Sequence, residues 1–422
     1  MTGKLILFLF YRPVYFILKS ILILFHKALS PKLQNWIELR GQTFDLIPAT
    51  SRPRFLFHAS SGEVEYVKSM IRELKLLNIQ VDIFVSYSSP SAIKLFDNIR
   101  PFVHQFIPLP WDQPKVLSQF LEKINPHSVF FARTDLWIEF LFQLQKRRIL
   151  TYIISYNPSL TFQNQLGIKY FLNSLKGIFC VHSQQVETLR SLVPSEVNVS
   201  APGDTRFDQV FWRLQQPSKI NLLFNFKYAV LGSTWPEDEK EFLPILADII
   251  NSGFKLIWCP HEITLKNIQR VQQIIRNKNL KSINFSDMNK KNNETFDIIV
   301  MDQIGYLADL YRNAEWAFVG GSFKAKVHSV MEPLCCAIPV ITGPYIQNSP
   351  EALRYNRIVM NGLSVVQVIK SPGEFLIAVQ KINNLQKVDF KKLLIGNLEQ
   401  NRNATKKILQ QIIRWTQESL NF

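Results

Sequence analysis

The stretch Gly320-Gly321-Ser322-Phe323, followed by His328 and Glu332, decides the fold of this chain. The apolar residues 316–319 before it predict a short buried strand, and residues 329–337 after it predict a helix. A glycine turn between strand and helix lets a ligand approach backbone N–H groups that a Cβ would block. On a helix, His328 and Glu332 would share one face, where a carboxylate can accept hydrogen bonds from ribose hydroxyls. The pattern therefore indicates a nucleotide or sugar site at the carboxyl edge of a parallel sheet.

Strand-like and helix-like segments alternate along the whole chain. Its 422 residues are too many for one ordinary core, so two domains are expected. Near-continuous apolar runs such as 54–59, followed by amphipathic runs such as 63–77, indicate parallel strands with helices on both faces. The same rhythm restarts at 228–231, after the polar stretch 215–225. We predict an α/β fold of two doubly wound, Rossmann-like domains with an interdomain cleft.

Four parts are predicted along the chain. The polar residues 281–294 are expected to form a surface loop in the second domain, and residues 390–420 a single last helix. Residues 1–30 are expected to form an N-terminal membrane-anchor helix, residues 31–215 a first domain and residues 216–400 a second domain. Residues 401–422 are expected to form a C-terminal helix that packs across both domains.

Charge and cysteine usage limit the class of protein. The formal net charge of +16 suits a polyanionic partner, which can be nucleic acid, an acidic membrane surface or a phosphorylated substrate. The four cysteines form no C-x-x-C pair, which argues against a metal centre or a disulfide framework and favours a reducing, cytoplasmic setting.

The N-terminal segment 5–29 is dominated by Leu, Ile and Phe, but Arg12, Lys19 and His26 interrupt it. Their even spacing puts the three cations on one side of a helix. No uninterrupted apolar run reaches the ~18–20 residues of a spanning helix, and charges within the segment argue against a signal peptide. We interpret it as an interfacial helix with its cations at the lipid headgroups. Two alternatives remain open: the segment could be a short membrane-spanning helix, or it could be buried against the domain.

Candidate catalytic residues lie where predicted strands of the first domain end. Glu63 follows strand 54–59 and opens the next helix, so it is either a capping acid or a general base. Asp135 lies at another strand-to-helix turn of the same sheet edge, as a cap or as a second active-site carboxylate. Arg206, between acids near the domain junction, is either a salt-bridge partner or a phosphate contact.

The second domain carries further candidate ligand contacts. Ser233 and Thr234 follow Gly232 after a predicted strand and could bind phosphate at a helix N-terminus, although no Walker lysine follows. His261 ends another strand and could meet a phosphate or base, or be a satisfied surface histidine. No metal-binding motif and no hydrolase elbow is present.

Taken in order, these blocks resemble the family of 3-deoxy-D-manno-octulosonic acid (Kdo) transferases, which move Kdo from CMP-Kdo onto a lipid A precursor. The resemblance covers nearly the whole chain, in blocks 58–63, 133–137, 203–208, 232–239, 260–262, 302–311 and 320–332. It implies a metal-independent, inverting GT-B glycosyltransferase without a cofactor. Glu63 would be the general base and Asp135 the second acid, and Arg206 a candidate phosphate contact. The donor would be held by Ser233, Thr234, His261, Gly320, Gly321, Ser322, His328 and Glu332.

The resemblance also implies a location and partners. Residues 31–215 would bind the acceptor and residues 216–400 the donor, at the cytoplasmic face of the inner membrane in lipopolysaccharide core biosynthesis. The protein would be peripheral or monotopic on that anionic surface, with no nucleic-acid partner, and its oligomeric state is open. Asp135 stands where the family usually has Glu, and Ser329 where it usually has Asn, so the donor could be Kdo or a close analogue. Alternatives are a GT-B enzyme using a UDP-sugar on a membrane lipid, or a non-catalytic basic membrane- or nucleic-acid-binding protein.

Overall fold

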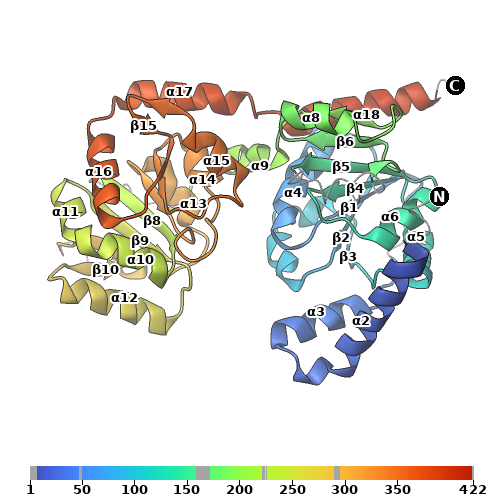
Figure 1. The fold of residues 1–422 in the computed structure, drawn as a ribbon, viewed down its shortest axis with the longest axis horizontal. Helices are drawn as coiled ribbons and strands as arrows, with labels where there is room; N and C mark the ends of the chain where they lie inside the picture. Colours follow the sequence, from blue (N-terminus) through green and yellow to red (C-terminus); the bar gives the residue numbers. More distant parts are fainter. Residues whose placement is uncertain are drawn as a thin grey trace. The chain divides into compact units, whose positions relative to one another are not determined.

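The computed structural model describes residues 7–46, 50–157, 172–220, 224, 226–288 and 295–420. Two compact units make up the chain, Met1–Gln209 with Asn401–Phe422, and Val210–Gln400, and each is described by itself (Figure 1). The sequence pattern also favours a helix over 169–175, of which residues 169–171 lie outside the described part. The two-domain prediction is confirmed as two parallel Rossmann-like sheets, whereas the interdomain cleft stays a prediction.

The first unit is built on a seven-stranded parallel sheet with the order β3-β2-β1-β4-β5-β6-β7. Its strands are β1 (Arg54–His58), β2 (Asp82–Tyr87), β3 (Gln105–Pro108), β4 (Ser128–Ala132), β5 (Leu150–Tyr156), β6 (Gly177–Cys180) and β7 (Asn198–Ser200). Its helices are α2 (Arg12–Leu24), α3 (Pro31–Gly41), α4 (Val64–Leu76), α5 (Pro114–Ile124), α6 (Ile138–Lys146), α8 (Ser183–Arg190) and α18 (Ala404–Leu420), with α9 (Thr205–Gln215) at the boundary.

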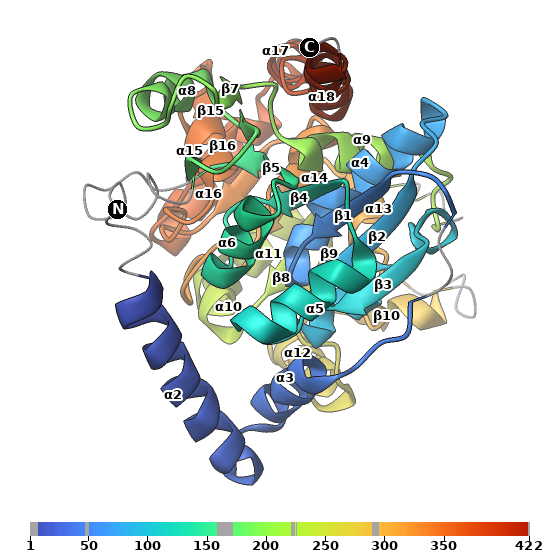
Figure 2. The same cartoon turned by 90° about the vertical axis from the view of Figure 1, so that its right-hand side faces the viewer.

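Helices cover both faces of this sheet, which explains why its central strands are apolar throughout. Alternate residues of one strand point to opposite faces. On β1, Phe57 belongs to the core shared with α4 and α18, and Leu56 to the core shared with α5 and α6. Figure 2 shows α5 and α6 in front of the strands of this unit.

The second unit repeats the design with the order β10-β11-β9-β8-β12-β13-β16, again with seven strands in parallel. Its strands are β8 (Tyr228–Thr234), β9 (Lys255–Pro260), β10 (Ser282–Asn284), β11 (Ile298–Val300), β12 (Ala317–Val319), β13 (Val340–Thr342) and β16 (Val366–Val368), beside the hairpin β14 (Val359–Met360) and β15 (Leu363–Ser364). Its helices are α10 (Pro236–Phe242), α11 (Leu246–Asn251), α12 (Leu265–Asn277), α13 (Leu307–Leu310), α14 (Met331–Cys335), α15 (Pro350–Asn356), α16 (Pro372–Asn383) and α17 (Lys387–Glu399).

The strand order marks one place in each sheet where ligands are expected. In the first sheet, successive connections run to opposite sides of the neighbouring pair β1 and β4, and in the second of the pair β8 and β12. At such a switch point the loops separate and leave a crevice outside the carboxyl ends of the strands. Glu63 follows β1, Asp135 follows β4, Ser233 ends β8 and Gly320 follows β12.

Two expectations about local structure were wrong. The segment 281–294 was expected to be a loop, but its start forms β10, whose Ile283 is buried against the edge of the sheet; residues 289–294 lie outside the described part. The segment 390–420 was expected to be one helix, but α17 and α18 are separate. The Asp208 carboxylate accepts hydrogen bonds from the N–H groups of Asn403 (2.8 Å) and Thr405 (2.7 Å), which caps α18 as a new helix.

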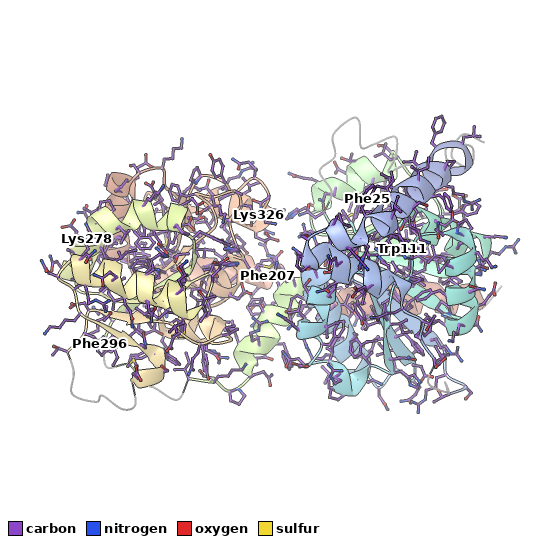
Figure 3. All side chains as sticks on the ribbon, turned by 90° about the horizontal axis from the view of Figure 1, so that it is seen from below. Phe25, Trp111, Phe207, Lys278, Phe296 and Lys326 are labelled. Atoms are coloured by element: carbon purple, nitrogen blue, oxygen red, sulfur yellow. The ribbon has the colours of Figure 1, made fainter. Side chains whose placement is uncertain are left out.

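The N-terminal helix α2 turns its cations toward the protein, which corrects the expectation that they face lipid headgroups. Arg12 forms two hydrogen bonds with Glu139 at 2.7 and 2.9 Å, and the ammonium of Lys19 donates to the Gln113 side chain. Around the rest of the helix and at its two ends, large apolar side chains are exposed: Leu9, Phe10, Val14, Phe16, Ile17, Leu18, Ile21, Ile23, Leu24 and Phe25. Figure 3 labels Phe25 at the end of this helix and Trp111 on the unit that it packs against. In the described part of the chain, no helix is long and apolar enough to cross a membrane.

Candidate functional site

The two predicted catalytic carboxylates lie at the switch point of the first sheet. The chain leaves β1 at His58 and forms a 3₁₀ turn, Ser61–Glu63, before α4 begins. It leaves β4 at Ala132 and turns at Arg133, whose φ is +58°. Because β1 and β4 are neighbours in the sheet, both turns emerge at the same edge.

Asp135 is held by a buried histidine. Nε2 of His58 lies 3.0 Å from Oδ2 of Asp135, and Nδ1 of the same ring lies 2.9 Å from Oγ of Ser86. Burial acts to raise the pKa of Asp135, but the attraction of His58, its hydrogen bond and that of Ser60 lower the pKa to about 2. Asp135 is therefore ionised throughout the physiological pH range.

Glu63 is affected in the opposite direction. Burial raises the pKa of Glu63 and the negative charge of Asp135 raises it further, while its own backbone N–H and the cations of Arg133 and Arg206 oppose the rise. Two carboxylates whose environments push their pKa values apart are suited to different tasks. The one with the raised pKa holds a proton more readily than an ordinary carboxylate, and the other remains a fixed charge.

Two arginines lie beside Glu63 on the ring of Tyr66. The guanidinium carbons of Arg133 and Arg206 lie 5.3 and 5.8 Å from its centroid, and Arg133 donates a 2.8 Å hydrogen bond to the Tyr66 hydroxyl. Buried Thr205 fixes the loop before α9, because its hydroxyl donates to the Tyr66 carbonyl at 2.8 Å. Paired guanidinium groups of this kind suit a phosphate or carboxylate ligand.

A pocket of about 260 Å³ lies at the switch point of the second sheet. Three predicted donor contacts, Ser233, His328 and Glu332, line it together. Arg213, which was not predicted, also lines it, and its Nη1 lies 3.8 Å from Oε1 of Glu332. The other lining residues are Gly305, Leu307, Ala308, Tyr311, Val319 and Ser329.

The expected helix 329–337 is shorter in the structure, which corrects how His328 and Glu332 come together. Only α14 (Met331–Cys335) is helical, and His328 lies before it, with its N–H donating to the Gly320 carbonyl at 3.0 Å. The two side chains therefore do not share a helical face. They meet in the pocket because the loop after β12 folds back on its own glycine.

An aromatic stack that sequence reasoning missed holds the two predicted histidines. The rings of Trp235 and His261 stack at 4.4 Å, and those of His261 and His328 at 4.5 Å. The indole N–H of Trp235 donates to Nε2 of His328 at 3.0 Å, so the proton of a neutral His328 is on Nδ1. Burial, the neighbouring His261 and Lys326 lower the pKa of His328 to about 4, which keeps the ring neutral.

Three other predicted contacts serve the framework of the pocket. The Thr234 hydroxyl is buried and accepts a 2.9 Å hydrogen bond from Trp258. The Ser322 hydroxyl is buried and accepts one from the N–H of Gly343 at 2.7 Å. Gly321 has a φ of +89°, and a Cβ there would meet the ring of His328.

Asp238 joins the two loops of this switch point. Its carboxylate accepts hydrogen bonds from the backbone N–H groups of Trp235 (2.9 Å), Gly321 (2.7 Å) and Phe323 (3.1 Å). The sequence signal was present, because Asp238 stands three residues after Trp235 at a helix start, as in a capping box. Its bonds to the distant loop could not be read from that local pattern.

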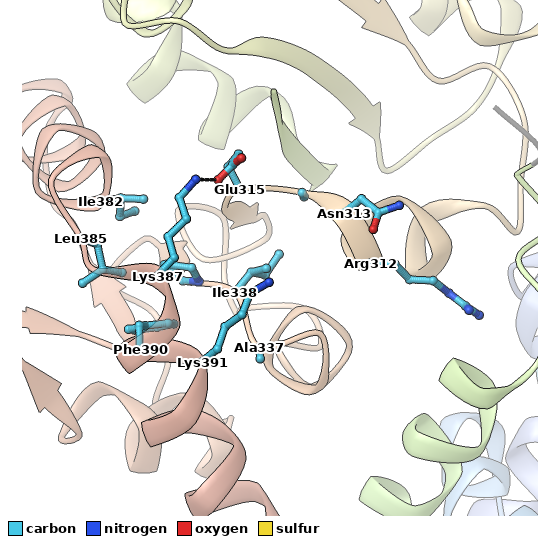
Figure 4. A pocket seen from close by; sticks show the side chains of 12 residues that line it. Arg312, Asn313, Glu315, Ala337, Ile338, Ile382, Leu385, Lys387, Phe390 and Lys391 are labelled. Carbon is cyan, nitrogen blue, oxygen red and sulfur yellow. Dashed lines mark hydrogen bonds and ion pairs between the residues drawn. The ribbon is translucent and has the colours of Figure 1, made fainter. Parts of the chain in front are cut away.

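Another cavity, of about 220 Å³, lies at the opposite edge of the second sheet (Figure 4). It is lined by residues 312–315, which precede β12, and 337–339, which precede β13, together with side chains of α16 and α17. None of the predicted site residues lines it. Within the described residues, no group of His, Cys, Asp and Glu is arranged to hold a metal ion.

The two parallel Rossmann-like sheets define a GT-B-like fold. A family model described as 3-deoxy-D-manno-octulosonic-acid transferase (kdotransferase) matches residues 35–209. The 3-deoxy-D-manno-octulosonic acid transferase of Chlamydia pneumoniae is 24% identical over 297 residues, which are 65% of this chain and 65% of that protein. The transferase of the same name from Haemophilus influenzae is 24% identical over 381 residues, 82% of this chain and 84% of that one. The chain is therefore similar in sequence to the Kdo transferases over most of its length.

The comparison with solved structures supports the same fold. The UDP-GlcNAc 2-epimerase of Neisseria meningitidis, in a structure bound to UDP-GlcNAc, aligns with a TM-score of 0.61 at 14% identity. The alignment covers 86% of this chain and all (100%) of that one. At this identity the likeness concerns the fold alone.

We predict that Gly320→Ala destabilises the second unit. A Cβ at Gly320 would collide with the Ser233 carbonyl oxygen and lie 2.8 Å from Cα of Thr234, and these backbone atoms cannot move aside. The free energy of unfolding should fall by about 1–3 kcal/mol, measured by urea titration of tryptophan fluorescence. Gly373→Ala is the matched control, because a Cβ there meets nothing within 4 Å. Equal midpoints for the two variants would contradict the prediction.

Proposed function

We propose that the chain is an inverting glycosyltransferase that moves Kdo from CMP-Kdo to a lipid A precursor, at the cytoplasmic face of the inner membrane. The observation that carries the proposal is the pair of carboxylates at the switch point of the first sheet. Asp135 is kept ionised and the pKa of Glu63 is raised. One group is therefore a fixed charge and the other a stronger base than an ordinary carboxylate.

In the proposed reaction, Glu63 accepts the proton of the acceptor hydroxyl. The acceptor oxygen forms its bond to the anomeric carbon of Kdo while the bond from that carbon to the CMP phosphate oxygen breaks. The bonding electron pair leaves with the phosphate of CMP, so the proton on Glu63 and the charge on CMP balance. A single displacement of this kind inverts the configuration at the anomeric carbon.

The pocket of the second unit suits the donor. Glu332 offers carboxylate oxygens to ribose hydroxyls, and Arg213 offers a cation to the phosphate. The neutral His328 adds a ring N–H without adding charge. A nucleoside monophosphate linked to a sugar acid is compatible with this combination of an acidic side chain (Glu332), a basic one (Arg213) and a neutral hydrogen-bond donor (His328).

The first unit suits a phosphorylated lipid acceptor. Arg133 and Arg206, beside Glu63, form a cationic pair on Tyr66 that matches an acceptor phosphate. The exposed apolar side of α2 matches the acyl layer of a membrane. The helix would lie in the interface, with its apolar side in lipid and its polar side on the protein.

We predict that Glu63→Gln lowers kcat by about 10²–10⁴-fold, the usual contribution of a general base. The amide has nearly the same shape as the carboxylate but cannot accept the proton, so the melting temperature and CMP binding should not change. In the wild type, kcat/KM should fall with decreasing pH as Glu63 becomes protonated. Because its pKa is raised, this acid limb should lie above the ordinary carboxyl value of about 4.3.

Glu73→Gln is the matched control for this test. Glu73 is half-buried on the same helix, α4, and burial raises the pKa of its carboxyl as well. This variant should keep wild-type turnover. Normal turnover of Glu63→Gln would refute the base assignment.

We predict that CMP raises the melting temperature of the protein more than UDP does. A ligand of the native state at about 100 times its Kd adds about 2.7 kcal/mol of stability. Glu332→Gln should reduce the CMP shift, since the amide loses the charge that strengthens hydrogen bonds to ribose. A shift with UDP or UDP-GlcNAc and none with CMP would favour the alternative of a UDP-sugar enzyme.

We predict that the triple variant Phe10→Ser, Phe16→Ser and Leu24→Ser loses binding to anionic vesicles. The three side chains are 63%, 61% and 77% exposed, and each apolar side chain of this size contributes about 1.5–3 kcal/mol when buried in an apolar phase. Co-sedimentation with vesicles measures the loss. Val388→Ser, 79% exposed on α17, is the control and should bind as the wild type does. Unchanged sedimentation of the triple variant would exclude α2 as the membrane contact.

A further inference from the structure

We propose that Tyr11 and Arg12, on the inner side of the N-terminal helix, are positioning residues for the loop that carries Asp135. The N-terminal helix would then have two roles. Its outer, apolar side would contact lipid, and its inner, polar side would position the loop that carries Asp135. The proposal rests on the proposed roles of Glu63 and Asp135 in transfer.

The first contact is the ion pair of Arg12 with Glu139. Glu139 is fully buried (0% exposed) in the first turn of α6, and Nε and Nη2 of Arg12 donate to its two carboxylate oxygens. Gln143, one turn further on, donates to Oε1 of Glu139 at 2.6 Å. A two-pronged pair of this kind fixes orientation as well as distance. Without Arg12, a buried carboxylate would lose its counter-charge.

The second contact runs from Tyr11 through Asp112 to the start of the same helix. The Tyr11 hydroxyl donates to Oδ2 of Asp112 at 2.5 Å. The Asp112 carboxylate accepts hydrogen bonds from the backbone N–H groups of Glu139 and Phe140, each with an N···O distance of 3.0 Å. Trp137, at the N-cap position of α6, provides no side-chain cap of its own. The start of α6 therefore depends on Asp112, and Tyr11 holds Asp112 in place.

A third contact comes from α3, the next helix along the chain. Arg40 is buried, donates to the Pro110 carbonyl at 2.9 Å, and places its guanidinium carbon 4.0 Å from the ring centroid of Trp137. Its charge also acts on Asp135. Three sets of contacts from the N-terminal segment thus act on residues 137–140: Arg12 with Glu139, Tyr11 through Asp112, and Arg40 with Trp137.

Only Leu136 and Trp137 separate Asp135 from α6. A change at the start of α6 is therefore transmitted directly to Asp135, whose contact with His58 is 3.0 Å long. Displacement of a catalytic group by about 1 Å can reduce turnover by about 10²-fold. The N-terminal helix is consequently part of the catalytic unit and not a removable tether.

The test uses full-length Arg12→Ala and Tyr11→Phe in detergent with a detergent-dispersed acceptor, so that membrane binding does not limit turnover. Hydrogen exchange of the amides of residues 138–140 is measured without substrates, together with kcat and the donor KM. We expect these amides to exchange about 10-fold faster, and kcat to fall about 10- to 100-fold with the donor KM unchanged. Arg12→Lys, which keeps the charge but loses the second prong, should fall between Arg12→Ala and the wild type.

Arg100→Ala is the matched control, because Arg100 pairs with Asp97 at 3.5 Å on the exposed surface of the same unit. It should leave exchange and kcat unchanged. Unaltered exchange and kcat in Arg12→Ala would overturn the proposal, as would exchange that accelerates equally throughout the unit, which would indicate general destabilisation. A wild-type protein without Kdo transfer would refute the proposed function, whereas the exchange result decides the positioning role by itself.

Discussion

The contact between buried His58 and Asp135 is the interaction on which the proposed chemistry depends. His58 is the last residue of β1, Ser86 is its register partner on β2, and Asp135 follows β4. One imidazole therefore joins the carboxyl ends of three adjacent strands. Because the sheet is buried on both faces, its register cannot shift without exposing both cores. The position of Asp135 is in this way a consequence of the packing of the sheet.

In the second unit, Asp238 connects the ends of neighbouring strands as His58 does in the first. Asp238 accepts N–H groups from the loop after β8 and from the loop after β12, which are the two loops of that switch point. Burial raises the pKa of Asp238, and the three backbone N–H groups that it accepts lower it. In each unit, one buried polar side chain connects segments that follow different strands. His58 does so in the first unit and Asp238 in the second. In each unit, candidate site residues are thus held in place by a polar side chain that was not singled out from the sequence.

The candidate site residues could be predicted from sequence, whereas the residues that hold them in place could not. Strand β1, helix α4 and the turn before Glu63 follow from local apolar periodicity and from a turn glycine, so they could be predicted. The partnership of His58 with Asp135 spans two strands, and nothing within either segment indicates it. The length of α14 was missed because the bond from His328 to the Gly320 carbonyl competes with a helical start. Pattern reasoning finds the residues at a strand end, and only the fold decides which of them meet.

The N-terminal helix shows this limit in its sharpest form. The spacing of Arg12 and Lys19 correctly predicted one polar side, but its direction depends on Asp112 and Glu139, which lie 101 and 127 residues away from their partners Tyr11 and Arg12. A helix with its cations at the headgroups would leave Glu139 buried without a counter-charge, which is costly. With the cations turned inward, that carboxylate is paired, and the large apolar side chains of the helix remain exposed. The electrostatics of the protein interior thus select the orientation that also leaves these apolar side chains exposed, which is the orientation that the proposed membrane contact requires.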